Sequence, residues 1–309
     1  MRQKVAPIGA LLLLCLIWAA ASLRSDLLPG TAAAMHVTPL ESEAMLLAIF
    51  AVLAGVAALT RKARWPRGRA LAMAGLVGLG LFVVPALLTD LGKGWIDDFT
   101  RVALFSLTPV FAVVFEPHLG TVFGNTVWGA GERGGFPAAL MAVVGTLLVF
   151  PVEIPHSAAS ALAFCGALAS AASVAAANCL GVRACRESSG SLLTFGAVAA
   201  GCAALCLGSL GAVLRKGEAS AVPFDAWAAP DLFALALLFW LMGRMTAVRM
   251  TTRFVIAPLL ANLVGLALLR PQVQLQAWFG LLLIALGSGW LLVAPRDNPE
   301  TSGSPLGLH

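Results

Sequence analysis

The side chains that most often carry chemistry in proteins are few in this sequence and widely spaced. The 309 residues include four histidines and six cysteines. The histidines fall between long apolar stretches or in the tail: His36, His118, His156 and His309. No Cys-X-X-Cys motif occurs and no cysteine lies close to a histidine, so the sequence predicts neither a zinc site nor a disulfide framework.

Two short motifs suggest enzymatic chemistry, but their surroundings argue against it. Asp97-Asp98 is similar to the acidic pair that holds Mg²⁺–diphosphate in membrane prenyl transferases, yet such a site needs several converging carboxylates and no second acidic motif is present. Gly129-Ala-Gly131-Glu-Arg-Gly134 spells GxGxxG, but no strand is predicted before it and no βαβ unit surrounds it. We predict no catalytic residue, no cofactor and no metal.

Ten apolar stretches make up most of the remaining sequence. Hydrophobic residues are 60% of the chain and charged residues 11%, against about 25% in soluble domains. Each stretch has roughly the twenty residues with which a helix crosses a hydrocarbon core. We predict spans at 5–23, 43–60, 70–89, 100–117, 136–151, 157–180, 191–213, 231–247, 252–269 and 274–294. The predicted class is an all-α integral membrane protein with ten transmembrane helices.

The ten stretches pair as two sets of five. Cys15-Leu-Ile-Trp18 corresponds to Cys165-Gly-Ala-Leu168, and Leu107-Thr-Pro109-Val-Phe-Ala112 to Ile256-Ala-Pro258-Leu-Leu-Ala261. The Ala138 and Gly145 spacing of the fifth stretch returns as Gly280 and Gly287 in the tenth. An odd number of helices per half inverts the second half, an architecture typical of secondary transporters. We predict repeats at 1–153 and 154–295 and a cytoplasmic tail at 296–309.

Basic residues orient the predicted spans. With the N-terminus in the cytoplasm, 14 of the 20 Lys and Arg residues fall in cytoplasmic segments, as the positive-inside rule expects, and both termini are cytoplasmic. The net charge of +5 therefore belongs to short loops and does not indicate nucleic-acid binding. Residues 1–23 also have features of a signal peptide, but the apolar run from Val5 to Leu23 is longer than a usual signal core.

The chain resembles the drug/metabolite transporter superfamily in its EamA-like ten-helix branch. The resemblance is carried by Trp18 in the first span, Thr108 to Ala112 in the fourth, Ala257 to Ala261 in the ninth, and Gln276-Ala-Trp-Phe-Gly280 in the tenth. It implies a multi-pass protein of a bacterial inner membrane that moves a small organic metabolite by alternating access, with export as the expected direction. A homodimer is compatible with it.

The span interiors contain few polar groups, among them Ser106 and Asn178. Prolines within helices free backbone carbonyls, which in lipid must face protein or a wet cavity. Two tryptophans lie near mid-span, and two arginines flank helices that build the central cavity in the family, although snorkelling to the interface is an equally strong interpretation of these arginines. The predicted substrate site comprises Trp18, Thr108, Pro109, Trp240, Arg244, Arg253, Pro258 and Asn262, with Arg244 or Arg253 at its cytoplasmic mouth.

Such a lining suits an amphipathic metabolite, and the arginines suit one that bears a carboxylate or a phosphate. The expected partners are a small-molecule substrate and the lipid bilayer, without nucleic acid. Two other function classes remain open. One is a membrane-embedded enzyme acting on a lipid-linked substrate, and the other is a membrane scaffold or sensor that transports nothing.

Overall fold

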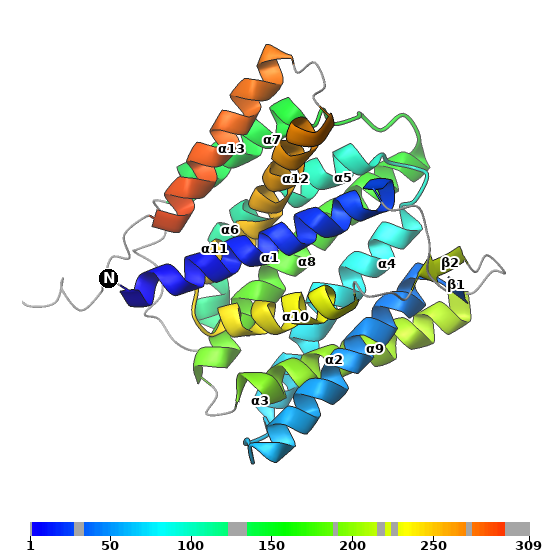
Figure 1. Cartoon of the computed structure of the whole chain (residues 1–309), viewed down its shortest axis with the longest axis vertical. Helices are drawn as coiled ribbons and strands as arrows, with labels where there is room; N and C mark the ends of the chain where they lie inside the picture. Colours follow the sequence, from blue (N-terminus) through cyan, green and yellow to red (C-terminus); the bar gives the residue numbers. More distant parts are fainter. Residues whose placement is uncertain are drawn as a thin grey trace, which may run out of the picture.

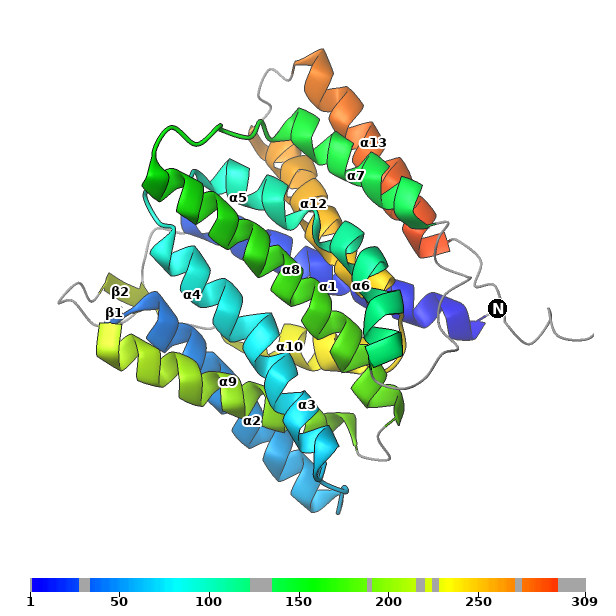
Figure 2. The same ribbon diagram turned by 180° about the vertical axis from the view of Figure 1, so that it is seen from behind.

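The computed structural model describes residues 2–27, 34–122, 135–187, 191–214, 220–223, 228–269 and 274–293. Within these ranges the chain forms a bundle of helices and one small antiparallel sheet, in which β1 (Ala34–Val37) pairs with β2 (Ser220–Pro223). The sheet lies at one edge of the bundle (Figures 1 and 2). The sequence analysis missed it, because each strand has only four residues and its partner is far away along the chain.

The helices follow the order of the predicted stretches. In the first half they are α1 (Arg2–Leu27), α2 (Pro39–Thr60), α3 (Arg69–Gly78), the π-helical turn η1 (Leu79–Val83), α4 (Val84–Leu91), α5 (Asp98–Phe105), α6 (Thr108–Val122) and α7 (Gly135–Val149). In the second half they are α8 (Ala158–Glu187), α9 (Leu192–Leu214), α10 (Ala228–Met242), α11 (Ala247–Thr251), α12 (Arg253–Leu269) and α13 (Leu275–Val293).

Seven helical runs in the described residues are long and apolar enough to cross a membrane. They are Pro39–Thr60, Arg69–Leu91, Asp98–Leu119, Ala158–Arg186, Leu192–Leu214, Ala247–Ala267 and Leu275–Val293. Three further apolar helices are shorter: Ala6–Ser22, Gly135–Val149 and Ala228–Met242. Large apolar side chains are exposed on the outside of the bundle, as on α13 at Leu282, Leu286 and Trp290. By length, composition and surface, these are the helices of a multi-pass membrane protein.

Small residues let several helices approach closely. A Cβ atom added to Gly145 on α7 would lie 2.6 Å from the carbonyl oxygen of Gly280 on α13. One added to Gly287 would lie 2.7 Å from the carbonyl oxygen of Ala138. On α3, a Cβ at Gly78 would overlap the backbone of Ala199 on α9. Close backbone contact of this kind is a main source of packing energy between helices in lipid.

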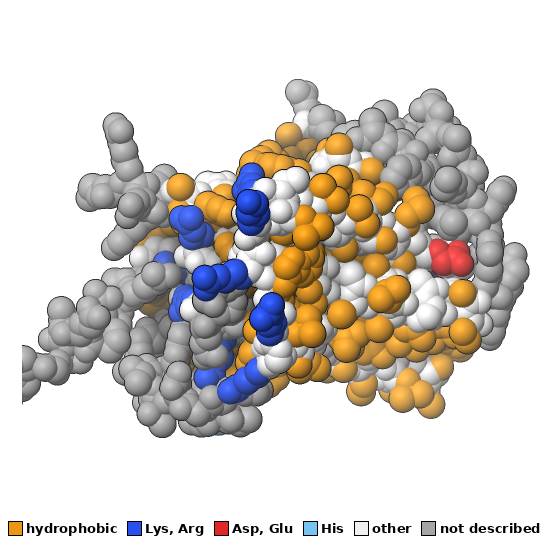
Figure 3. Space-filling model, turned by 90° about the horizontal axis from the view of Figure 1, so that it is seen from below, with side chains coloured by type: hydrophobic (Ala, Val, Ile, Leu, Met, Phe, Trp, Pro, Cys, Tyr) orange, Lys and Arg blue, Asp and Glu red, His pale blue; other side chains and the backbone are white. Residues whose placement is uncertain are grey.

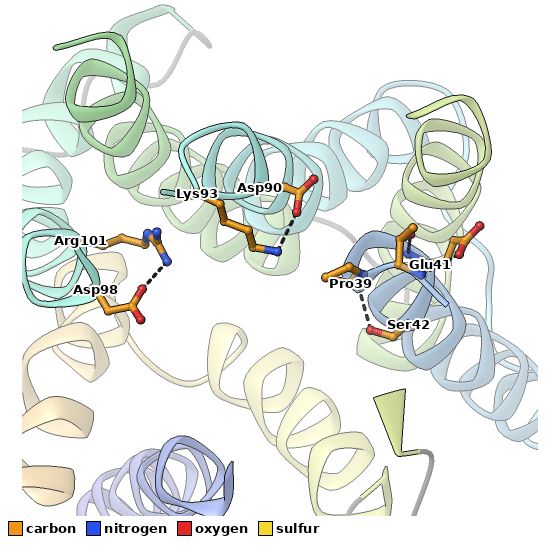
Figure 4. A network of polar contacts seen from close by, with 8 residues as sticks. Pro39, Glu41, Ser42, Asp90, Lys93, Asp98 and Arg101 are labelled. Atoms are coloured by element: carbon orange, nitrogen blue, oxygen red, sulfur yellow. Dashed lines mark hydrogen bonds and ion pairs between the residues drawn. The ribbon is translucent and has the colours of Figure 1, made fainter. Parts of the chain in front are cut away.

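The acidic pair of the sequence analysis has a structural role. Asp97 caps α5 by accepting a hydrogen bond from the backbone N–H of Thr100 at 3.0 Å, and Asp98 forms an ion pair with Arg101 at 2.8 Å. A second local pair joins Lys93 to Asp90 at 2.7 Å. Figure 4 shows both pairs beside the beginning of α2, at one end of the bundle. These carboxylates bind their own helices and do not converge on a metal-sized site.

On one face of the molecule, basic and acidic side chains lie at opposite ends. Figure 3 shows Lys and Arg side chains gathered at one end of the face it draws, and acidic side chains at the opposite end. The beginning of α1 and the end of α13 lie on the same side of the bundle in both ribbon views (Figures 1 and 2). The motif at 129–134 and the tail at 296–309 lie outside the described residues.

Candidate functional site

Arg253 is the most unusual charged residue in the described part of the chain. Its side chain is the largest of those that are fully buried, with 1% of the residue exposed. The Nη1 atom donates to the side-chain oxygen of Asn178 at 3.0 Å and to the backbone carbonyl of Met250 at 3.2 Å. The Nε atom is buried and has no hydrogen-bond partner. One part of a buried guanidinium is therefore held by the protein and another is left without an acceptor.

A break in the helix places Arg253 inside the bundle. Thr246 caps the short helix α11, and Thr252 separates α11 from α12. Both threonines are buried, and each hydroxyl donates a hydrogen bond to a carbonyl three residues earlier, Thr251 to Val248 and Thr252 to Arg249. The carbonyl of Met250, next to this break, accepts a hydrogen bond from the Arg253 guanidinium.

The predicted ninth span, 252–269, agrees with α12, which begins at Arg253 and ends at Leu269. The short helix α11 precedes α12, and the apolar run that includes both helices begins at Ala247. The sequence analysis ended the eighth span and began the ninth around the crowded arginines, because charges are normally kept out of lipid. The structure buries Arg253 among protein atoms, which keeps its charge out of contact with lipid.

Aromatic rings cover the guanidinium. Its Cζ atom lies 5.5 Å from the ring centroid of Trp18 on α1 and 4.7 Å from that of Phe254. The ring centroids of Trp18 and Phe254 are 6.4 Å apart, and those of Phe254 and Phe105 on α5 are 5.9 Å apart. All three rings are half-buried. Cation–π contacts stabilise a buried cation, typically by about 2 kcal/mol when it is desolvated.

Asn178 is oriented toward Arg253 by its own helix. The residue is fully buried on α8, and its Nδ2 donates to the carbonyl of Val174 one turn earlier at 2.6 Å. This fixes the amide so that Oδ1 faces the guanidinium. The Arg253 cluster, defined here as Arg253, Asn178, Trp18, Phe254 and Phe105, therefore draws on α12, α8, α1 and α5.

The cluster contains no acid. The ion pairs of Asp90 with Lys93 and of Asp98 with Arg101 do not involve Arg253. The two hydrogen-bond partners of Arg253 are a neutral amide and a backbone carbonyl. The site therefore carries a net positive charge and can attract an anion.

Two other arginines differ from Arg253 in what they bind. Arg183 donates to the carbonyl of Leu119 near the end of α6 at 3.0 Å, and Arg186 donates to the carbonyl of Met245 after α10 at 3.3 Å. Both contacts lie where a helix ends and its last carbonyls need donors. These arginines join helix ends, whereas Arg253 lies in the middle of a packed cluster.

Trp240 and Arg244 form a second pair, apart from the Arg253 cluster. Arg244 is exposed just after α10, and its Cζ atom lies 5.1 Å from the ring centroid of Trp240. Neither side chain makes a hydrogen bond or ring contact with the Arg253 cluster among the described residues. The structure thus brings Trp18 together with Arg253, and Trp240 together with Arg244, but does not join the two pairs.

The polar side chains among the remaining predicted residues form hydrogen bonds within their own helical segments. Pro109 is the second residue of α6, a position where a helix makes no use of the backbone N–H that proline lacks. The carbonyl of Phe105, four residues before Pro109, instead accepts a hydrogen bond from the hydroxyl of Thr108. Pro258 lies inside α12, as expected, and its carbonyl accepts Nδ2 of Asn262 at 2.8 Å. Pro258 and Asn262 share a face of the helix, as their spacing predicts.

Two kinds of residue in the cluster were not assigned to the site from the sequence. Asn178 stood out as an amide in an Ala-rich stretch, but its partner is 75 residues away. Phe105 and Phe254 gave a weaker signal, because aromatic residues inside spans are usually packing. Their shared separation of 149 residues, the same as that of Pro109 and Pro258, was the available hint.

Comparison with known proteins gives information on the fold alone. No protein-family model matches the chain, and no curated protein matches it. Among solved structures, 25 chains are similar in fold. One, described only as a crystal structure of a protein, is 16% identical with a TM-score of 0.68, over 95% of this chain and 99% of the other. The chain therefore shares its overall fold with this structure.

Proposed function

We propose that this protein is a secondary transporter of a small organic metabolite, built from ten membrane spans in two inverted repeats and related to the EamA-like drug/metabolite transporters. The observation that carries the proposal is the way the helices pair. The most closely packed helix pairs either map onto themselves or have a counterpart after a shift of five spans. Alternating access needs two such halves, which can rock against each other around a shared site.

The pairing supports two-fold symmetry. The α1 helix packs on α12, and α8, five spans after α1, packs on α6. The α1 helix also packs on α10, as α8 packs on α3 and α4. Two pairs map onto themselves, α2 with α9 and α7 with α13. In the second of these, the contacts Ala138–Gly287 and Gly145–Gly280 exchange places under the symmetry.

The sequence offset agrees with this pairing. Asp97 and Thr246, the caps of α5 and α11, are 149 residues apart, as are Pro109 and Pro258. Phe105 and Phe254 share the same offset and contact each other. Residues related by a two-fold axis meet only when they lie near it. The contact of these two rings therefore supports an axis that passes beside the Arg253 cluster.

The Arg253 cluster is the proposed centre of transport. It joins helices of both halves, and Arg253 at its centre is a charged side chain that is 1% exposed inside an apolar bundle. Ionisable groups inside membrane bundles are expensive and usually mark substrate or ion pathways. The separation of charge in Figure 3 supports the orientation proposed from the sequence, with both termini in the cytoplasm of a bacterial cell.

Topology and flux test the proposal. Reporter fusions after Arg69, Lys93 and Arg296 are expected to read inside, outside and inside. Purified protein screened against a metabolite library by thermal shift is expected to yield stabilising compounds that also exchange across proteoliposome membranes. An outside signal at Arg296 would refute the ten-span arrangement. Stabilising compounds that never cross the membrane would refute transport and favour a binding or enzymatic role.

A further inference from the structure

We propose that the substrate is an organic monoanion with a flat apolar or aromatic body, and that its acidic group binds the free edge of Arg253. The inference rests on the proposed function, since it names the substrate class of the same site. It starts from the charge, continues through the geometry of the guanidinium and ends with the rings that surround it.

The charge of Arg253 has no internal counterion. Its side chain donates hydrogen bonds to the Asn178 amide and the Met250 carbonyl, and no carboxylate forms an ion pair with it among the described residues. Removing a cation from water into a bundle is costly unless an opposite charge accompanies it. Neutral acceptors and aromatic faces compensate only in part. An anionic ligand would complete the compensation, and the site would bind it strongly for that reason.

The geometry leaves a suitable edge for such a ligand. Both protein hydrogen bonds use Nη1, and Nε is buried without an acceptor. Nε–H and the neighbouring Nη2–H form the edge on which arginine takes a carboxylate by two parallel hydrogen bonds. Asn178 and Met250 thus fix the guanidinium from one side and leave this edge for an exogenous acid. One guanidinium without a second cation matches a single negative charge better than a phosphate dianion.

The surrounding rings indicate the body of the ligand. Trp18 and Phe254 are half-buried and lie against the cation, and Phe105, also half-buried, contacts Phe254. Flat rings favour stacked or tilted contacts with another flat apolar group. Because only 1% of Arg253 is exposed, a ligand reaches it after α1 and α12 separate or the Trp18 ring turns. A change of this kind is what alternating access provides.

Matched small molecules test the charge requirement. The purified full chain is heated with phenylacetate, phenylacetamide, phenethylamine or inorganic phosphate at equal concentrations, together with the larger monoanion indole-3-acetate. We expect the aromatic carboxylates to raise Tm and the amide, the amine and phosphate to leave it unchanged. Equal stabilisation by phenylacetamide, or no response to either carboxylate, would overturn the proposal. A response to phosphate alone would indicate a different anion and overturn the aromatic monoanion.

Variants assign the effect to the cluster. Arg253→Gln is expected to weaken phenylacetate binding by about thirtyfold or more, as expected for loss of a buried charged partner. Arg61→Gln, which removes an exposed charge at the end of α2, should leave the affinity unchanged. Asn178→Asp places a carboxylate where the amide oxygen now meets Arg253. It should raise Tm without ligand and abolish the response to phenylacetate, an outcome that misfolding cannot produce.

Flux separates this inference from the proposed function. Phenylacetate that stabilises the wild type but does not cross proteoliposome membranes would leave the anion site standing and refute transport. Transport of neutral or cationic compounds that Arg253→Gln leaves intact would support transport and overturn the anion site. An unchanged phenylacetate response in Asn178→Asp would also overturn it.

Discussion

The broken helices α5–α6 and α11–α12 share the same backbone arrangement but differ in the side chains that they bury near the break. Each begins at a capped residue, Asp97 or Thr246, is interrupted after a short helix and continues through a proline. In the first, the hydroxyls of Ser106 and Thr108 donate to carbonyls next to the break, and the buried residues from Thr100 to Thr108 are uncharged. In the second, Arg253 occupies the position that Leu104 holds in the first, 149 residues earlier.

The difference teaches that the scaffold and the site are separable. Caps, breaks and prolines recur in both halves because each half must pack in the same way. A charge has to be compensated by particular neighbours, and Asn178 and Trp18 provide these only around α12. A binding site for an asymmetric ligand can therefore form beside a two-fold axis without disturbing the packing that both halves share.

Placing an arginine in the first break should have the largest effect. Leu104 is 4% exposed, and Leu104→Arg would bury a cation without the neighbours that Arg253 has. An uncompensated buried charge costs about 3–5 kcal/mol, so we expect little monodisperse protein after purification. Leu104→Met, which keeps the volume and adds no charge, should purify like the wild type. Normal yield and Tm for Leu104→Arg would show that the two breaks are equally able to hold a charge.

Equivalent glycines on α7 and α13 should be equally sensitive. Gly145→Ala and Gly287→Ala each force a methyl group against facing backbone, at 2.6 Å and 2.7 Å. Overpacking of this kind costs about 1–3 kcal/mol, measured as lowered thermal stability in detergent. Gly289→Ala, on α13 like Gly287, places its methyl group where no atom lies within 4 Å and serves as the control. A loss in only one of the two glycine variants would argue that the halves are not equivalent at this contact.

Removing the hydroxyl of Thr108 tests the first break more gently. Thr108→Val leaves the Phe105 carbonyl without its side-chain donor in a buried position, which costs about 1–3 kcal/mol. Thr60→Val removes a similar bond, to Ala57, from an exposed helix end and should change Tm little. If both variants lose the same stability, the Phe105 carbonyl does not depend on the Thr108 hydroxyl as its hydrogen-bond donor.

The helix caps should give the smallest effects. Asp97→Ala and Thr246→Ala each remove an N-cap hydrogen bond, for a loss of about 1 kcal/mol. The Asp97 bond is 3.0 Å long and the Thr246 bond 3.5 Å, so we expect the larger fall in Tm for Asp97→Ala. Asp98→Ala breaks an exposed ion pair and should be nearly neutral. A larger effect for Thr246→Ala would reverse this ranking of the two breaks.

Much of the fold is readable from local chemistry. Apolar stretches of span length form helices because lipid and packing both require their backbone groups to bond within the chain, and helical segments do occupy the predicted stretches. The prediction that Pro258 and Asn262 share a face depended only on a spacing of four residues, and their hydrogen bond confirms it. Pro109 was predicted to lie within the fourth span, whereas in the structure it lies in the first turn of α6, because the chain breaks between α5 and α6.

The sequence by itself determined the apolar stretches, their order and the presence of three arginines between 244 and 253. Only the tertiary structure decided that Arg244 is exposed beside Trp240 while Arg253 is buried against Asn178 and Trp18. The physical reason is that burial of a charge depends on acceptors and rings from other helices. Asn178 and Trp18 are 75 and 235 residues away along the chain, and packing alone brings them to the guanidinium.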